Sequence, residues 1–81
     1  MTDAEIYAAL TVIFQDVFLR DDLVLTPTLS ANDVPGWDSF KQIEILIASE
    51  QHFGIKLSSR EIDGLTNVGD LVSAVAARNQ A

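Results

Sequence analysis

Apolar residues recur at spacings of three and four in three stretches of this sequence, which is the pattern of helices that each bury one face. The first stretch runs from about Asp3 to Phe18, and Thr2 with Glu5 has the capping-box spacing that predicts its start. Its apolar face consists of Ile6, Leu10, Ile13, Phe14 and Val17. No stretch alternates apolar and polar residues as a half-buried strand does, so the sequence predicts an all-helical fold.

The second predicted helix begins near Ser39 and ends near Phe53, where Gly54 supplies the left-handed residue that ends many helices. Its expected core face collects Ile45, Leu46, Ser49 and Phe53, with Gln42 as an unusually polar neighbour. A second apolar row lies roughly opposite and consists of Phe40, Ile43 and Ile47. Either the preceding loop buries this row or the row faces a partner, and the small size of the bundle favours a partner surface.

Two further helices are predicted beyond Gly54. Ser58 and Glu61 have capping-box spacing and open a short helix through about Asp63. Asn67 with Asp70 opens the last helix. The apolar face of that helix consists of Val68, Leu71, Val72 and Val75. The expected architecture is a four-helix bundle of three longer helices and one short helix, with a long loop between the first and second.

The loop from Arg20 to Asp38 has no helical periodicity and contains Pro27, Pro35 and Gly36. Long loops in compact domains are usually functional or disordered. Apolar residues that can hold this loop against the helices are Leu23, Val24, Leu25, Leu29 and Val34. We therefore expect an ordered loop.

Length and charge restrict the possible functions. We expect a single domain over residues 1–81. The 81 residues include no cysteine, which excludes disulfides and thiolate metal sites. The stretch from Asp21 to Asp33 lacks the alternate acidic ligands and central glycine of a calcium loop, so we expect no metal site. Twelve acidic and five basic residues give a net charge of −7, which disfavours nucleic acids and anionic membranes and suits basic protein partners. No apolar run is long enough to span a bilayer, and the N-terminus is acidic where a signal peptide is basic. The sequence thus predicts a cytoplasmic protein that does not insert into membranes.

Ser39 lies where the loop meets the second helix. A serine here is most often a helix cap, although Asp38 can cap equally well. The free N–H groups and positive dipole end of a helix start also favour a phosphodiester at this position. A catalytic nucleophile needs a nearby base, but His52, the single histidine, lies about 20 Å along the same helix. A serine that is modified fits the position better than one that attacks a substrate.

Residues 36–40, Gly-Trp-Asp-Ser-Phe, resemble the Asp-Ser-Leu attachment motif of acyl carrier proteins. The similarity continues through the long first loop, Ile43-Glu44-Ile45, Glu50 to Ile55 and the Thr-Asn-Val that opens the last helix. It implies that a phosphopantetheinyl transferase moves 4′-phosphopantetheine from coenzyme A onto Ser39. The thiol of this arm would hold acyl groups as thioesters, and the protein itself would catalyse nothing.

The resemblance also implies partners and a docking surface. The partners would be acyl-activating, synthase or acyltransferase enzymes with basic docking patches, in fatty-acid, polyketide-like or lipid-modifying biosynthesis. The positions that match the family's docking helix are Asp38, Phe40, Ile43, Glu44, Ile47 and Glu50. We expect a monomer, because a carrier has to dock with several enzymes in turn.

Departures from the family pattern keep two alternatives open. Phe40 replaces the usual leucine, and Lys41 stands where fatty-acid carriers usually have an acid, which indicates a discrete, specialised carrier. An aminoacyl or peptidyl carrier is the nearest alternative, although Pro35-Gly36-Trp37 replaces the glycine pair more typical of such carriers. The other alternative is a helical adaptor without a cofactor, for which the apolar row would serve equally well.

Overall fold

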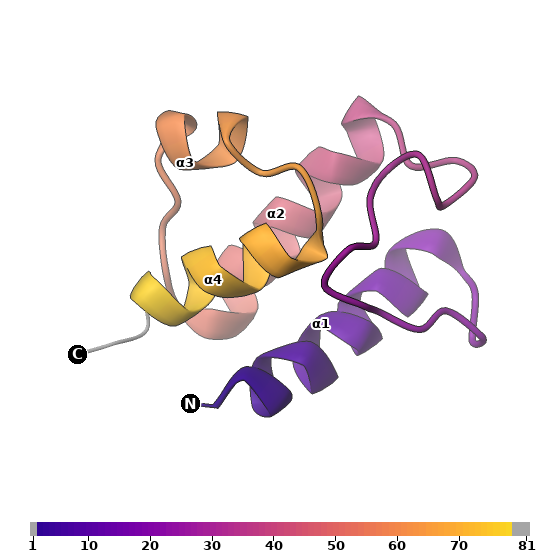
Figure 1. Cartoon of the computed structure of the whole chain (residues 1–81), viewed down its shortest axis with the longest axis horizontal. Coiled ribbons are helices and arrows are strands. Elements are labelled where there is room, and N and C mark those ends of the chain that lie inside the picture. The colour runs from indigo at the N-terminus through magenta and orange to yellow at the C-terminus, as the bar shows by residue number, and fades with distance from the viewer. Residues whose placement is uncertain (1, 79–81) are drawn as a thin grey trace.

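The computed structural model describes residues 2–78, and every regular element in this part of the chain is a helix. The bounds are Asp3–Phe18 for α1, Ser39–Phe53 for α2, Ser59–Asp63 for α3 and Val68–Arg78 for α4. Helix α1 packs against both α2 and α4, and short α3 lies on the far side of the molecule from α1 (Figure 1). The predicted four-helix bundle with its long first loop is confirmed. None of the described helices is long and apolar enough to cross a membrane.

The helix ends follow the predicted caps. Thr2 and Glu5 form the capping box of α1. The Asp38 side chain caps α2 by accepting from the Lys41 backbone N–H at 3.0 Å, which makes Ser39 the first helical residue. Gly54 ends α2 with a φ of 66°, in the left-handed region where glycine carries no Cβ penalty. These contacts lie within a few residues of one another, which is why the sequence predicts them.

The core forms from the faces that the periodicity predicts. The predicted faces of α2 and α4 are buried in full, and α1 buries its predicted face except for Val17, which is partly exposed. Ser49 is fully buried in α2, where its hydroxyl donates to the Ile45 carbonyl at 2.7 Å. Such a bond within the helix satisfies the hydroxyl without a partner from elsewhere in the core.

The long loop joins the core and also caps α4. Leu23 and Val34 are buried, and Leu25 and Leu29 pack against the core as expected. The expectation for Val24 is wrong, because its side chain is 72% exposed. Two loop carbonyls accept hydrogen bonds from the first N–H groups of α4, Leu29 O from Val68 at 2.8 Å and Pro27 O from Gly69 at 2.9 Å. The loop therefore satisfies donors that a helix start otherwise leaves unpaired.

Candidate functional site

The N-terminus of α2 leaves Ser39 open to modification. Ser39 is exposed, and within residues 2–78 its hydroxyl has no hydrogen-bond partner. The backbone N–H groups of Ser39 and Phe40 likewise have no acceptor in that part of the chain. Free N–H groups at a helix start suit a phosphate ester on the neighbouring hydroxyl. His52 is exposed near the opposite end of α2, too far away to activate Ser39 as a base.

A cleft of about 520 Å³ opens beside Ser39, within the usual size of a small-molecule site. It lies between α2, α3 and the segment that leads into α4. Apolar lining residues are Phe14, Ala31, Trp37, Ile43, Leu46, Ile62, Leu65, Val68 and Leu71. Polar lining residues are Asp38, Ser39, Gln42, Thr66 and Asn67. A flexible arm on Ser39 therefore starts at a largely apolar cleft, so the surroundings of this hydroxyl fit a long pendant group.

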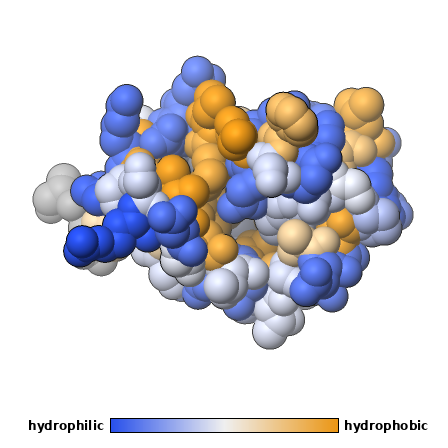
Figure 2. Space-filling view, turned by 90° about the horizontal axis from the view of Figure 1, so that it is seen from above, coloured by the Kyte–Doolittle hydropathy of each residue, from blue (hydrophilic) through white to orange (hydrophobic). Residues whose placement is uncertain are grey.

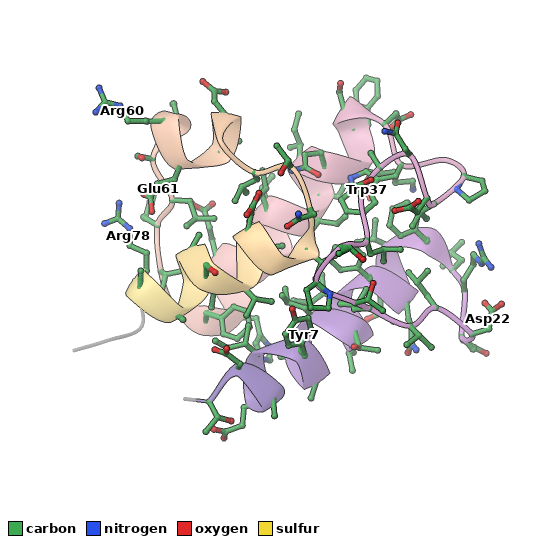
Figure 3. The ribbon with its side chains drawn as sticks, viewed as in Figure 1. Tyr7, Asp22, Trp37, Arg60, Glu61 and Arg78 are labelled. Carbon is green, nitrogen blue, oxygen red and sulfur yellow. The ribbon has the colours of Figure 1, made fainter. Side chains whose placement is uncertain are left out.

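Trp37 forms part of the cleft wall next to the start of α2 (Figure 3). Its ring packs edge-on against Phe14, with centroids 5.2 Å apart, and lies 6.0 Å from the ring of Phe18. Its indole N–H donates to Gln42 Oε1 at 2.7 Å. This bond explains why the core side of α2 tolerates a glutamine. Sequence reasoning missed it, because the helix periodicity does not say where Trp37, which precedes the helix, places its ring.

Helix α3 is tied to the end of α4 by an ion pair. Arg78 donates to both carboxylate oxygens of Glu61, and Figure 3 shows the two side chains directed at each other while Arg60 points away. The hydrogen bonds from Arg78 and, next, from the Ser58 backbone N–H lower the pKa of Glu61 from 4.5 to about 2. Ile62, the next residue in α3, lines the cleft, so the pair holds one cleft wall in place.

We expect Glu61→Gln to lower the thermal midpoint at pH 7. The difference in midpoint between the variant and the parent should shrink as the pH falls. The pKa of Glu61 is about 2 in the folded protein, against an ordinary value of 4.5. Its carboxylate therefore stabilises the fold fully above pH 4.5, and this contribution is lost as the pH falls toward 2. Glutamine still accepts from the Ser58 N–H, so the variant removes the charge and keeps the capping box. Melts of both proteins between pH 7 and pH 2 measure this difference. A difference independent of pH would contradict the role of the charge.

The apolar row on α2 is exposed, and the loop does not cover it. Phe40 is 78% exposed, Ile43 53% and Ile47 49%. Figure 2 shows apolar side chains standing among hydrophilic ones on the upper face of the molecule. Ile43 also lines the cleft, so the row reaches the rim of the site that Ser39 borders. The exposure predicted for this row is confirmed.

The acidic positions predicted for docking also make contacts inside the protein. Asp38 caps α2, and Glu44 is exposed and lies 3.7 Å from Lys41 Nζ. Glu50 is partly buried, and its carboxylate accepts the Leu57 backbone N–H at 2.8 Å. Within residues 2–78, no three acidic or histidine side chains lie close enough together to hold a metal ion.

Lys41 has a structural partner as well. Its ammonium group donates to the Val17 carbonyl at 3.2 Å, near the C-terminal end of α1. A cation at that end of a helix interacts favourably with the helix dipole. Lysine at this position thus joins the start of α2 to the end of α1, whatever its effect on partner enzymes.

The known proteins that are similar to this chain agree with one another in their names. The family described as "Phosphopantetheine attachment site" matches residues 8–75. The meromycolate extension acyl carrier protein of Mycolicibacterium smegmatis is 32% identical, over 91% of this chain and 75% of the relative. The acyl carrier protein of Acidothermus cellulolyticus is 29% identical, over 94% of this chain and 90% of the relative. Some relatives are longer: the match covers 56% of the putative mitochondrial acyl carrier protein of Schizosaccharomyces pombe.

A solved structure agrees with these sequence relatives. The solution structure of holo acyl carrier protein from Geobacter metallireducens superimposes with a TM-score of 0.84 and 42% sequence identity. The match covers 89% of this chain and 83% of that one. Because the family match spans most of the chain and the fold agrees over the same length, this protein belongs to the acyl carrier protein family, whose members bear covalently attached 4′-phosphopantetheine.

Proposed function

We propose that Ser39 is the attachment point of the arm. The observation that carries this proposal is the exposed Ser39 hydroxyl at the start of α2, on the rim of the cleft. Ser39 Oγ would form a phosphodiester with the phosphorus next to the pantetheine as the pyrophosphate bond of coenzyme A breaks. Adenosine 3′,5′-bisphosphate would leave, and the hydroxyl proton would pass to the transferase. The arm supplies a terminal thiol, which the chain itself lacks because it has no cysteine. As a member of its family the chain is a carrier and not an enzyme.

Intact-protein mass spectrometry tests this proposal. The chain is incubated with coenzyme A and a broad-specificity phosphopantetheinyl transferase, and we expect a mass gain of one phosphopantetheine. No gain in a folded sample would favour the adaptor without a cofactor. A gain on another residue, located by peptide mapping, would keep the family function and move the attachment site.

The lining of the cleft favours acyl over aminoacyl cargo. Its lining includes leucine, isoleucine and phenylalanine side chains, against which a charged ammonium group is costly to bury. The name of the M. smegmatis relative places that protein in meromycolate extension, a lipid pathway. We infer that this chain carries acyl intermediates for lipid or polyketide-like biosynthesis and that synthase and acyltransferase enzymes receive them.

The exposed row of Phe40, Ile43 and Ile47 is the docking surface we propose for these enzymes. Glu44 lies among these residues on α2, and the chain has a net charge of −7, so a partner with a basic rim around an apolar patch complements the row. The same net charge favours a dissolved, monomeric carrier, which we propose to work in the cytoplasm.

Loading by the transferase also tests the docking row. We expect Ile47→Ser to lower kcat/KM for arm transfer about tenfold, because it removes an apolar side chain from the contact without touching Ser39. Val12→Ser is the matched control, since Val12 is 57% exposed but lies on α1. Equal rates for the two variants would mean that the transferase does not use the row.

A further inference from the structure

Two side-chain amides line the cleft, Gln42 from α2 and Asn67 from the segment before α4. Both amide oxygens are already engaged. Gln42 Oε1 accepts the Trp37 indole N–H at 2.7 Å, and Asn67 Oδ1 accepts the Asp70 backbone N–H at 2.8 Å. Indole and backbone N–H groups only donate, so they must bind the oxygen of each amide and not its NH₂ group.

Each amide consequently keeps an NH₂ group without an acceptor among residues 2–78. Both side chains are partly buried, and most of the surrounding wall is apolar. Within residues 2–78, neither Thr66 nor Asp38 accepts from these NH₂ groups: the Thr66 hydroxyl donates to Asp70 at 2.6 Å, and the Asp38 carboxylate accepts the Lys41 backbone N–H at the helix start. The residues that line the cleft therefore include two amides whose NH₂ groups donate to no acceptor among residues 2–78.

The two NH₂ groups would distinguish cargoes that carry a hydrogen-bond acceptor from cargoes that do not. A saturated hydrocarbon in the cleft would displace water from the two NH₂ groups and return no hydrogen bond. A keto or hydroxyl oxygen on the chain would accept from them. We propose that Gln42 and Asn67 are specificity-determining residues that favour acyl groups with hydrogen-bond acceptors, such as 3-oxoacyl or polyketone chains, over saturated ones. This inference rests on the proposed carrier function.

Two cargoes of equal length test the proposal. The full chain is loaded with the octanoyl or the 3-oxooctanoyl form of a pantetheine arm whose thioester is replaced by a stable amide, and loading is verified by mass. The arm is the same in both forms, so its own carbonyls contribute equally. We expect the 3-oxooctanoyl form to melt roughly 4–8 °C higher, the shift that one additional hydrogen bond gives in a domain of this size.

Two nearly isosteric variants identify the donors. Gln42→Glu and Asn67→Asp keep an oxygen for the Trp37 and Asp70 N–H groups but remove the NH₂ groups. We expect each variant to reduce the difference between the two cargoes, and the double variant to abolish it. The emission of Trp37, the only tryptophan, reports whether its hydrogen bond survives. Gln51→Glu adds the same charge at an exposed position of α2 and should leave the difference unchanged.

The outcomes separate the two proposals. Equal midpoints for both cargoes in the parent, or a difference that persists in the double variant, would overturn the selectivity of the cleft and leave the carrier function intact. Failure of the parent to gain any arm would overturn the carrier function at Ser39, and the selectivity would fall with it.

Discussion

Ser39→Ala is expected to lose the entire mass gain from arm transfer while its thermal midpoint stays close to that of the parent. The loss should be complete because alanine has no oxygen to form the phosphodiester. The fold should be unaffected because the Ser39 hydroxyl is exposed and makes no hydrogen bond within residues 2–78. Asp38 performs the capping of α2, and alanine is a good helix former.

The chain provides a closely matched control for this variant. Ser59 is the first residue of α3 and follows the N-cap Ser58, as Ser39 is the first residue of α2 and follows Asp38. Both serines are exposed. Ser59→Ala should therefore gain one arm like the parent. A mass gain in Ser39→Ala, or none in Ser59→Ala, would assign the modification to another hydroxyl.

The features that could be predicted from the sequence depend on residues that lie close together along the chain. Helix bounds depend on periodicity and on caps such as Thr2 with Glu5, whose partners lie three residues apart. The exposure of Phe40 follows from the helical angle alone, since a helix in a small bundle buries one face. The Asp-Ser motif at the start of α2 is also local, which is why the sequence alone makes Ser39 the candidate for the attachment site.

The features that could not be predicted join residues far apart in the sequence. The ion pair of Glu61 with Arg78 spans 17 residues, and the bond from Lys41 to Val17 spans 24. No sequence period encodes such contacts. The exposure of Val24 could not be predicted either. An apolar side chain in an irregular loop can face the core or the solvent, and its direction depends on the path of the loop. The cleft combines elements that are distant along the chain, so its polar wall follows from the packing of the helices and not from any one motif.

Gly69 shows how a long-range contact constrains one residue of α4. Its N–H donates to the Pro27 carbonyl, which brings the long loop directly against the first turn of the helix. A Cβ atom at this position would lie 2.9 Å from Pro27 O and 3.3 Å from Asn67 Oδ1. The closer distance is to a backbone atom, which a side-chain rotation cannot relieve. Glycine is therefore required here by the loop and not by the backbone angles of the helix.

We expect Gly69→Ala to lower the free energy of unfolding by about 1–3 kcal/mol. Overpacking costs about 1–3 kcal/mol, and weakening the bonds to Pro27 O and Leu29 O adds about 1 kcal/mol for the two together, which is part of the roughly 0.5–1.5 kcal/mol that each is worth. The better helix propensity of alanine returns only about 1 kcal/mol. The thermal midpoint should fall by roughly 5–20 °C. Calorimetry or circular dichroism measures the shift, and arm transfer well below the midpoint should persist because Ser39 lies on α2.

Gly64→Ala separates this contact from the general effect of replacing a glycine. Gly64 ends α3 with a φ of −85°, and a Cβ atom there would lie 3.6 Å from Glu61 O, an ordinary contact. Alanine fits this backbone without strain, so the variant should be neutral or up to about 1 kcal/mol more stable. A similar loss in both variants would mean that the loop does not set the requirement at Gly69. A loss in Gly69→Ala alone would establish the loop from Arg20 to Asp38 as the part of the fold that holds α4, and with it Asn67, in place beside the cleft.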